Sequence, residues 1–143
     1  MRLIFIATAV ALVVAIPATG IASPARVEHW SAASSTAMAI TGNILLSPTR
    51  LLAAGKTLPL AVAADVTDFH TNQGPQSARI LKVTRPADPT LLNDNTLCGA
   101  PVRWIAVYRS DGGKDLNMSV FKGATRPHGE IGPDVCGTFL YSR

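Results

Sequence analysis

Apolar and polar residues alternate in several short stretches of the chain, and this period of two is typical of β-strands that bury one face. The clearest stretches are residues 78–83, 102–109, 116–122 and 138–143. In the last of them, Phe139 and Tyr141 share one face. The stretch 102–109, with the sequence VRWIAVYR, is apolar on both faces, which predicts a central strand.

The N-terminal half shows the same pattern less regularly. Four apolar residues fall on one face of an expected extended strand: Met38, Ile40, Ile44 and Leu46. Gly42 interrupts this face and predicts a bulge or bend. Residues 50–62 predict a hairpin that turns at residues 54–56. Pro59 lies in the second strand of this hairpin and has no N–H to donate, so we expect that strand at a sheet edge or at a bulge.

Turn-forming residues separate these stretches. The composition of 68–77 and of 124–134 predicts loops, and SDGGKD at 110–115 predicts a hairpin loop. Residues 88–93 predict a single helical turn capped by Asp88. About seven strands and little helix result, which predicts a mainly β fold, either a small antiparallel barrel or a sandwich.

Residues 1–22 have the parts of an export signal peptide. Arg2 supplies the positive start, and an apolar run from Leu3 to Ile16 follows it. This run of about 14 residues is shorter than the roughly 20 that a membrane-spanning helix needs. Small residues then allow cleavage after Ala22 or after Ala25.

The signal peptide predicts an exported protein, either periplasmic or secreted. Residues 23–35 are small and polar apart from Trp30, and we expect them to form a flexible lead-in. Residues 36–143 are then a single β-rich domain. We expect no transmembrane span once the signal has been removed, because no second apolar stretch is long enough.

The charge of the mature chain is mildly basic. Removal of the signal takes Arg2 with it and leaves 12 basic against 9 acidic residues, a net charge of +3. The cations are scattered singly, which is not the pattern of a nucleic-acid-binding surface. A partner, if there is one, is therefore expected to be an anionic envelope component or an acidic protein face.

The two cysteines, Cys98 and Cys136, are expected to form one structural disulfide. An exported chain enters a compartment where disulfides persist. No Cys-x-x-Cys spacing supports a redox pair, and no histidine stands at a zinc-finger spacing from either cysteine. A cross-link over 38 residues is worth roughly 4 kcal/mol in the chain-entropy picture.

The sequence assigns no catalytic residue, metal ligand or cofactor. SVFK at 119–122 has the Ser-x-x-Lys pattern of acyl-transfer enzymes, but Ser119 and Lys122 point to opposite faces of a strand. No nucleophile-elbow, zinc-protease or phosphate-loop motif occurs. The expectation is therefore a protein that is not an enzyme.

Two histidines keep an alternative open. His70 and His128 fall in expected loops close to Asp68 and Glu130, and a histidine with a carboxylate is the minimum for general acid–base catalysis. A small hydrolase is the rival hypothesis. A fold that brought either imidazole to a carboxylate in a cleft would favour it.

The expected central strand carries the candidate binding residues. Trp104 and Tyr108 share one of its faces, and Arg103 and Arg109 share the other. Aromatic side chains in the mouth of a barrel can stack on a ligand. The alternative is that the aromatic residues fill the core and the arginines lie in water at the strand ends.

Three segments resemble parts of small exported bacterial proteins of unassigned function. They are AITGNILLSPTRLLAAGKTLPL, RPADPTLLNDNTLCG and CGTFLYSR. In size, export signal and β content the chain is also similar to the periplasmic lysozyme inhibitors of the membrane-bound C-type class, which are small barrels. Their inhibitory loop carries Ser-Gly-x-x-Tyr, which this chain lacks.

These observations favour a non-catalytic β-domain that acts as a binding or inhibitory module of the bacterial envelope. Two alternatives stand beside it, the small hydrolase and a purely structural envelope component. An open, lined cavity in the barrel would favour a ligand bound inside it, whereas a filled core would favour binding elsewhere.

Overall fold

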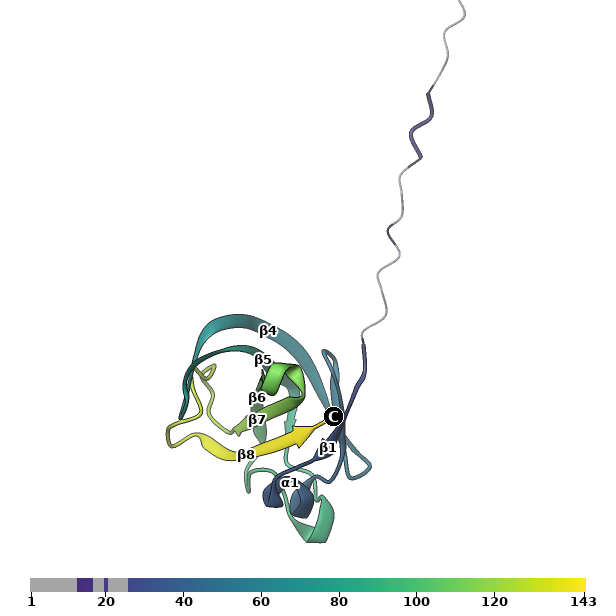
Figure 1. The fold of residues 1–143 in the computed structure, drawn as a ribbon. Coiled ribbons are helices and arrows are strands. Elements are labelled where there is room, and N and C mark those ends of the chain that lie inside the picture. Colours follow the sequence, from purple (N-terminus) through teal and green to yellow (C-terminus); the bar gives the residue numbers. More distant parts are fainter. Residues whose placement is uncertain (1–12, 17–19, 21–25) are drawn as a thin grey trace, which may run out of the picture.

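The computed structural model describes residues 13–16, 20 and 26–143 and contains a closed antiparallel barrel of eight strands (Figure 1). The strands are β1 (Glu28–Ala32), β2 (Ile44–Ser47), β3 (Arg50–Ala53), β4 (Lys56–Thr71), β5 (Gly74–Ala87), β6 (Val102–Ser110), β7 (Asp115–Phe121) and β8 (Val135–Ser142). One short helix, α1 (Ser35–Ile40), and two 3₁₀ turns (Leu92–Asp94 and Asp111–Gly113) connect them. The mainly β fold is confirmed, and the barrel replaces the sandwich alternative.

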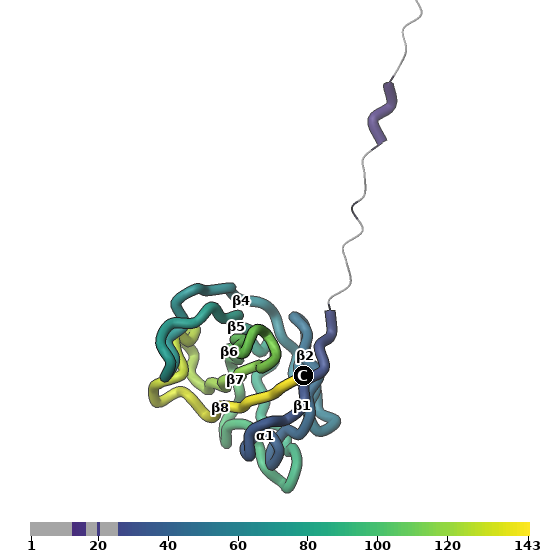
Figure 2. Tube along the Cα trace, viewed as in Figure 1, coloured from purple at the N-terminus to yellow at the C-terminus, as the bar shows by residue number. Residues whose placement is uncertain are grey.

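The barrel closes where β1 pairs with β8. Each strand pairs with its neighbours in sequence, and Ser31 and Ala32 of β1 pair with Ser142 and Tyr141 of β8. The C-terminus consequently lies beside β1 (Figure 2). The strand that the sequence prediction missed is β1, because its polar composition resembles a lead-in. The lead-in prediction for 23–35 is wrong over 28–32, where the buried Trp30 anchors the strand.

The barrel interior is filled by the inward faces of all eight strands. Alternation on the later strands puts Leu116, Met118, Phe139 and Tyr141 into it, each at most 3 % exposed. Eight strands enclose a space just wide enough for side chains to fill, so no central cavity is needed to explain the fold. The alternation predicted for the stretches after residue 101 is confirmed.

A second apolar cluster lies on the outer face of β5, β6 and β7. Its buried members are Phe69, Ala78, Ile80, Ala106, Tyr108 and Phe121. The long hairpin of β4 and β5 bends across this face, with register shifts at Val62/Ala64 and Val66/Phe69. The loop predicted for 68–77 is wrong apart from its turn, because Phe69 and Ala78 are buried here and extend both strands.

The loop 122–134 meets the β4–β5 hairpin next to this outer cluster, through a bridge between His70 and Gly129. Figure 2 shows the teal hairpin and the yellow-green loop close together. The His70 N–H donates to the carbonyl of His128, and the Glu130 N–H donates to the carbonyl of His70. A Cβ at Gly129 would lie 2.8 Å from the carbonyl oxygen of His70, so only glycine allows this crossing.

The strand expected through Met38 and Ile40 is wrong, because residues 35–40 form α1. The hydroxyl of Ser34 accepts from the Ala37 N–H and caps the helix, an arrangement that competes with the period-two pattern. Gly42, at φ +61°, ends the helix and lets β2 begin at Ile44. The hairpin turn at Ala54 and Gly55 and the strands around it are confirmed.

Pro59 lies in β4, which has a neighbour on each side in the closed barrel, but at Pro59 itself only one side is paired, so the predicted edge is present locally. Pro59 pairs with Arg50 of β3, and the pairing of β4 with β5 begins only at the next residue, Leu60. The missing N–H of Pro59 therefore breaks no backbone hydrogen bond between β4 and β5.

We call one end of the barrel the closed end, because α1 and the loop 88–101 cover it. Leu91 and Leu97 from this loop and Ala37 from α1 extend the interior core. The side-chain amides of Asn93 and Asn95 both donate to the carbonyl of Ala39, which holds the loop to the helix. The closed end is thus a packed plug.

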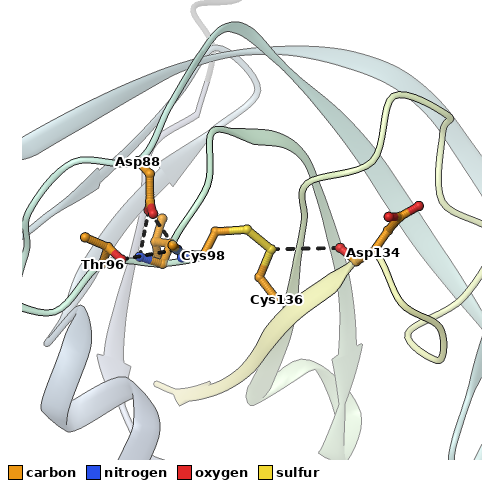
Figure 3. The surroundings of a disulfide bond; sticks show 7 residues. Asp88, Thr96, Cys98, Asp134 and Cys136 are labelled. Atoms are coloured by element: carbon orange, nitrogen blue, oxygen red, sulfur yellow. Dashed lines mark hydrogen bonds between the residues drawn. A yellow bond between two sulfur atoms is a disulfide. The ribbon is translucent and has the colours of Figure 1, made fainter.

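The disulfide Cys98–Cys136 fastens this plug to the start of β8, as predicted (Figure 3). The Cα atoms of the two cysteines lie 4.8 Å apart. Asp88 does not cap the predicted turn; its carboxylate accepts from the N–H groups of Leu97 and Cys98. The helical turn is displaced to Leu92–Asp94, because Asp88 holds the cysteine end of the loop instead.

The predicted signal peptide and both cleavage positions fall almost entirely outside the described residues. Within the described residues, no helix is long and apolar enough to cross a membrane.

Candidate functional site

The opposite end of the barrel holds an open pocket, and we call this end the mouth. It lies where β1 begins and β8 ends, next to the β2–β3 and β6–β7 turns. The pocket has a volume of about 510 Å³. It is lined by Arg26, Glu28, Leu46, Ser47, Pro48, Ser77, Arg79, Leu81, Val107, Tyr108, Arg109 and Leu116. Its volume is in the range of pockets that bind small molecules.

The base of the mouth is apolar because it is the end of the interior core. Leu46, Leu81, Val107 and Leu116 reach it from four different strands, and each belongs to the interior cluster. Their alternating positions on β2, β5, β6 and β7 point inward. A ligand that enters the mouth therefore meets the upper layer of the core.

The rim is charged, and one carboxylate holds two of its arginines. Glu28 Oε1 accepts hydrogen bonds from Nη2 of Arg109 and, at 2.9 Å, from Nη2 of Arg143. Both guanidinium groups also lie over the ring of Trp30, with their carbon atoms 5.2 Å and 4.4 Å from its centroid. This stack draws together β1, β6 and the chain end after β8.

Two further arginines face the mouth. Arg79 makes a two-point ion pair with Asp65, at 2.8 Å and 3.0 Å, on the exposed surface of the β4–β5 hairpin. Arg26 has no ion pair with any described residue, and the sequence before it contains no acidic residue. Among the charged residues that line the pocket, three arginines (Arg26, Arg79 and Arg109) stand against the one carboxylate of Glu28, while Asp65 lies outside the lining, so positive charge is in excess.

The electrostatics keep both carboxylates ionised. Partial burial by itself raises the pKa of Glu28, but the hydrogen bond and charge of Arg109, a hydrogen bond from Trp30 and the charge of Arg143 bring it below its usual value. The hydrogen bond from Arg79 lowers the pKa of Asp65. At neutral pH the rim therefore carries its full set of charges.

The four binding candidates from the central strand separate in the structure. Arg109 lies on the rim of the mouth, and Tyr108 also lines the pocket while its ring packs in the outer cluster. Trp104 packs against the outer cluster, with Nζ of Lys82 6.0 Å from its ring centroid. Arg103 is six residues before Arg109 on the same face, so it lies about 20 Å away toward the closed end.

His70 and His128 are brought together, but through their backbones. Both line a groove of about 300 Å³ under the loop 122–134. Among the described residues, no hydrogen bond or ion pair joins either imidazole to a carboxylate. Neither Asp68 nor Glu130 therefore forms with a histidine the hydrogen-bonded pair that would favour a hydrolase.

Glu130 instead anchors the loop to the outer face of β6 and β7. Its carboxylate accepts from Ser119 Oγ at 3.1 Å and from the Tyr108 hydroxyl at 3.3 Å. Burial, and then the neighbouring Glu130 charge, raise the pKa of Tyr108. The described residues contain no cluster of three or more potential metal ligands among His, Cys, Asp and Glu.

Arg26, Glu28 and Arg79 were not predicted from the sequence as members of one site. Glu28 is 81 positions from Arg109 and 115 from Arg143, so no local spacing connects them. The available signal was the alternation of β6, which places Arg109 on the inward face. Because the sequence did not predict β1 or the closure of the barrel through it, nothing indicated which residue would pair with Arg109 on that face.

We compared the chain with protein-family models, with curated proteins and with solved structures, and none of the three comparisons found a match. The site must therefore be interpreted from its own geometry and charge.

Proposed function

We propose that this protein is an exported, non-catalytic binding module of the bacterial envelope that takes an anionic ligand or partner group at its mouth. The observation that carries the proposal is the asymmetry of the barrel. One end is plugged and cross-linked, whereas the other holds a pocket of about 510 Å³ with an apolar base and an arginine rim. Concave sites with an apolar lining and a few fixed polar groups are typical of ligand binding.

Charge supports an anionic partner. Arginine presents a planar set of donors that matches carboxylate and phosphate groups, and it remains charged at any physiological pH. The excess of positive charge at the mouth would also raise the rate of encounter with an anion, an effect that salt screens over about 8 Å.

A retention experiment tests this proposal. The purified protein is immobilised, envelope extract is applied at low and at high salt, and the retained components are identified. The variant Arg79→Gln/Arg109→Gln removes charge from the mouth. The matched control Arg103→Gln/Arg126→Gln makes the same change in net charge on arginines that do not line the mouth.

We expect an anionic component that wild type and control retain at low salt and that the mouth variant loses. Retention that is equal in all three proteins would contradict binding at the mouth.

Export is a separate part of the proposal and needs its own measurement. Mass spectrometry of protein recovered from outside the cytoplasm should show an N-terminus at Ser23 or at Arg26. The disulfide fits an oxidising compartment. An intact Met1 in the mature protein would contradict cleavage.

A further inference from the structure

The mouth also carries information about the chemistry of its ligand. We propose that it binds an amphipathic carboxylate, an apolar chain with a single carboxylate head, and that Glu28 competes with that head for the same arginines. This inference rests on the proposed function, because it names the class of ligand for the same pocket.

The head group is inferred from what the arginines already hold. Arg109 and Arg143 converge on one carboxylate, that of Glu28, from β6 and from the C-terminal end. Both guanidinium groups lie over the ring of Trp30, which favours their position beside Glu28. Two guanidinium groups that already bind a side-chain carboxylate have their donors in positions that also fit the carboxylate of a ligand.

These charges are accessible. The side chains of Arg109 and Arg143 are 44 % and 48 % exposed, and Glu28 itself lines the pocket. Exposed ion pairs contribute little to stability, so exchange of Glu28 for another carboxylate costs little. Arg26, which has no ion pair among the described residues, faces the same space and offers a further contact for the head.

The apolar part is inferred from the base of the pocket. Leu46, Leu81, Val107 and Leu116 lie beneath the rim, and they present no polar side-chain atom to a ligand. Each methylene that moves from water onto such a surface gains about 0.8 kcal/mol when fully buried. A small hydrophilic anion would gain from the rim alone and would leave the apolar base unused.

Three probes separate the contribution of the carboxylate head to binding from that of the apolar chain. Decanoate, used below its micelle concentration, has both parts; acetate has the head alone; decyltrimethylammonium has the same chain with a cationic head. The fluorescence of Trp30 reports directly on the arginine stack. The variant Trp104→Phe, used as the background, leaves Trp30 as the one tryptophan of the chain.

Decanoate should change the Trp30 signal at concentrations at least about a hundredfold lower than acetate, because several methylenes reach the apolar base. Decyltrimethylammonium should cause no saturable change. The Arg109→Gln variant should bind decanoate about tenfold more weakly, since a hydrogen bond to a charged group is lost. The control Arg103→Gln, on the same strand but outside the mouth, should bind as wild type does.

The competition by Glu28 gives the sharpest prediction. Glu28→Gln has the same shape but no charge, so it should bind decanoate more tightly than wild type, by up to about fivefold. If circular dichroism shows that this variant has lost its fold, the comparison of Arg109→Gln with Arg103→Gln carries the test.

The outcomes distinguish this inference from the proposed function. Binding of acetate that depends on Arg109, with decanoate no tighter, would overturn the amphipathic ligand and leave an anion-binding module. Weaker binding of decanoate by a folded Glu28→Gln variant would overturn the competition. If calorimetry and Trp30 fluorescence detect no binding of either anion, and Arg79→Gln/Arg109→Gln retains the same envelope components as wild type, the proposed function fails as well.

Discussion

The two ends of the barrel differ in what they use to hold the chain together. The closed end has apolar packing, amide hydrogen bonds to α1 and the disulfide. The mouth has exposed ion pairs and arginines stacked on Trp30. Burial and cross-linking give most of the stability of small domains, whereas exposed ion pairs give little. The stability of this protein should therefore depend on one end and its binding on the other.

The largest expected effect is the loss of the disulfide. Cys98→Ser and Cys136→Ser should each lower the free energy of unfolding by about 4 kcal/mol, because the cross-link restricts the unfolded chain. Denaturant unfolding measures the change. The double variant should lose no more than either single one. A double variant that loses about twice as much would mean that the cysteines stabilise the fold separately.

A core truncation at the closed end comes next. Leu97 is 4 % exposed in the plug, and Leu97→Ala should cost about 3 kcal/mol through lost burial and the cavity that remains. Leu92→Ala in the same loop is the matched control. Leu92 is 38 % exposed, so its truncation should cost less than about 1 kcal/mol. Equal costs would mean that the loop does not plug the barrel.

A smaller effect is expected for Tyr141→Phe. The hydroxyl of Tyr141 is 2.8 Å from that of Thr41, and both residues are buried. Thr41 keeps its contacts with the carbonyls of Ala37 and Gly42, so the substitution should cost about 1 kcal/mol. Burial also raises the pKa of Tyr141 well above its usual value, so the phenol should resist ionisation in alkaline titration of the native protein. Ionisation at an ordinary pKa would contradict this burial.

The smallest effect on stability is expected at the mouth. The pKa of Glu28 is lower in the folded protein than in the unfolded chain, so its ion pairs stabilise the fold above the usual carboxyl range. As the pH falls through that range toward the native pKa, this contribution of less than about 1 kcal/mol should disappear. Between pH 6 and pH 3, the free energy of unfolding should fall less for Glu28→Gln than for wild type. An identical decrease in the free energy of unfolding would mean that Glu28 does not stabilise the folded state through its charge.

The comparison also shows which features the sequence makes predictable. Apolar alternation predicted β7 and β8, and the apolar run on both faces between Arg103 and Arg109 predicted β6 as a central strand. The disulfide followed from the small number of cysteines and their spacing. These features depend on local pattern or on the absence of other partners.

Other features depend on contacts that local pattern does not contain. The cap that Ser34 gives α1 overrode the alternation of Met38 and Ile40. Phe69 lies in a polar segment, and only the outer face of β6 and β7 explains its burial. A binding site in the mouth that includes Tyr108 and Arg109 was one hypothesis from the sequence, but its charged rim was not predicted, because Glu28 joins Arg79 and Arg109 only when β1 closes the barrel.

The central claim is that ligand binding occurs at the mouth and not at the closed end. The most direct measurement is a titration of the ¹⁵N-labelled protein with decanoate, followed by backbone amide NMR shifts. Our account predicts saturable shifts for amides lining the mouth, such as Arg79 and Arg109, and none around Leu97 or α1. Shifts confined to the closed end, or no saturable shift at the mouth, would contradict it.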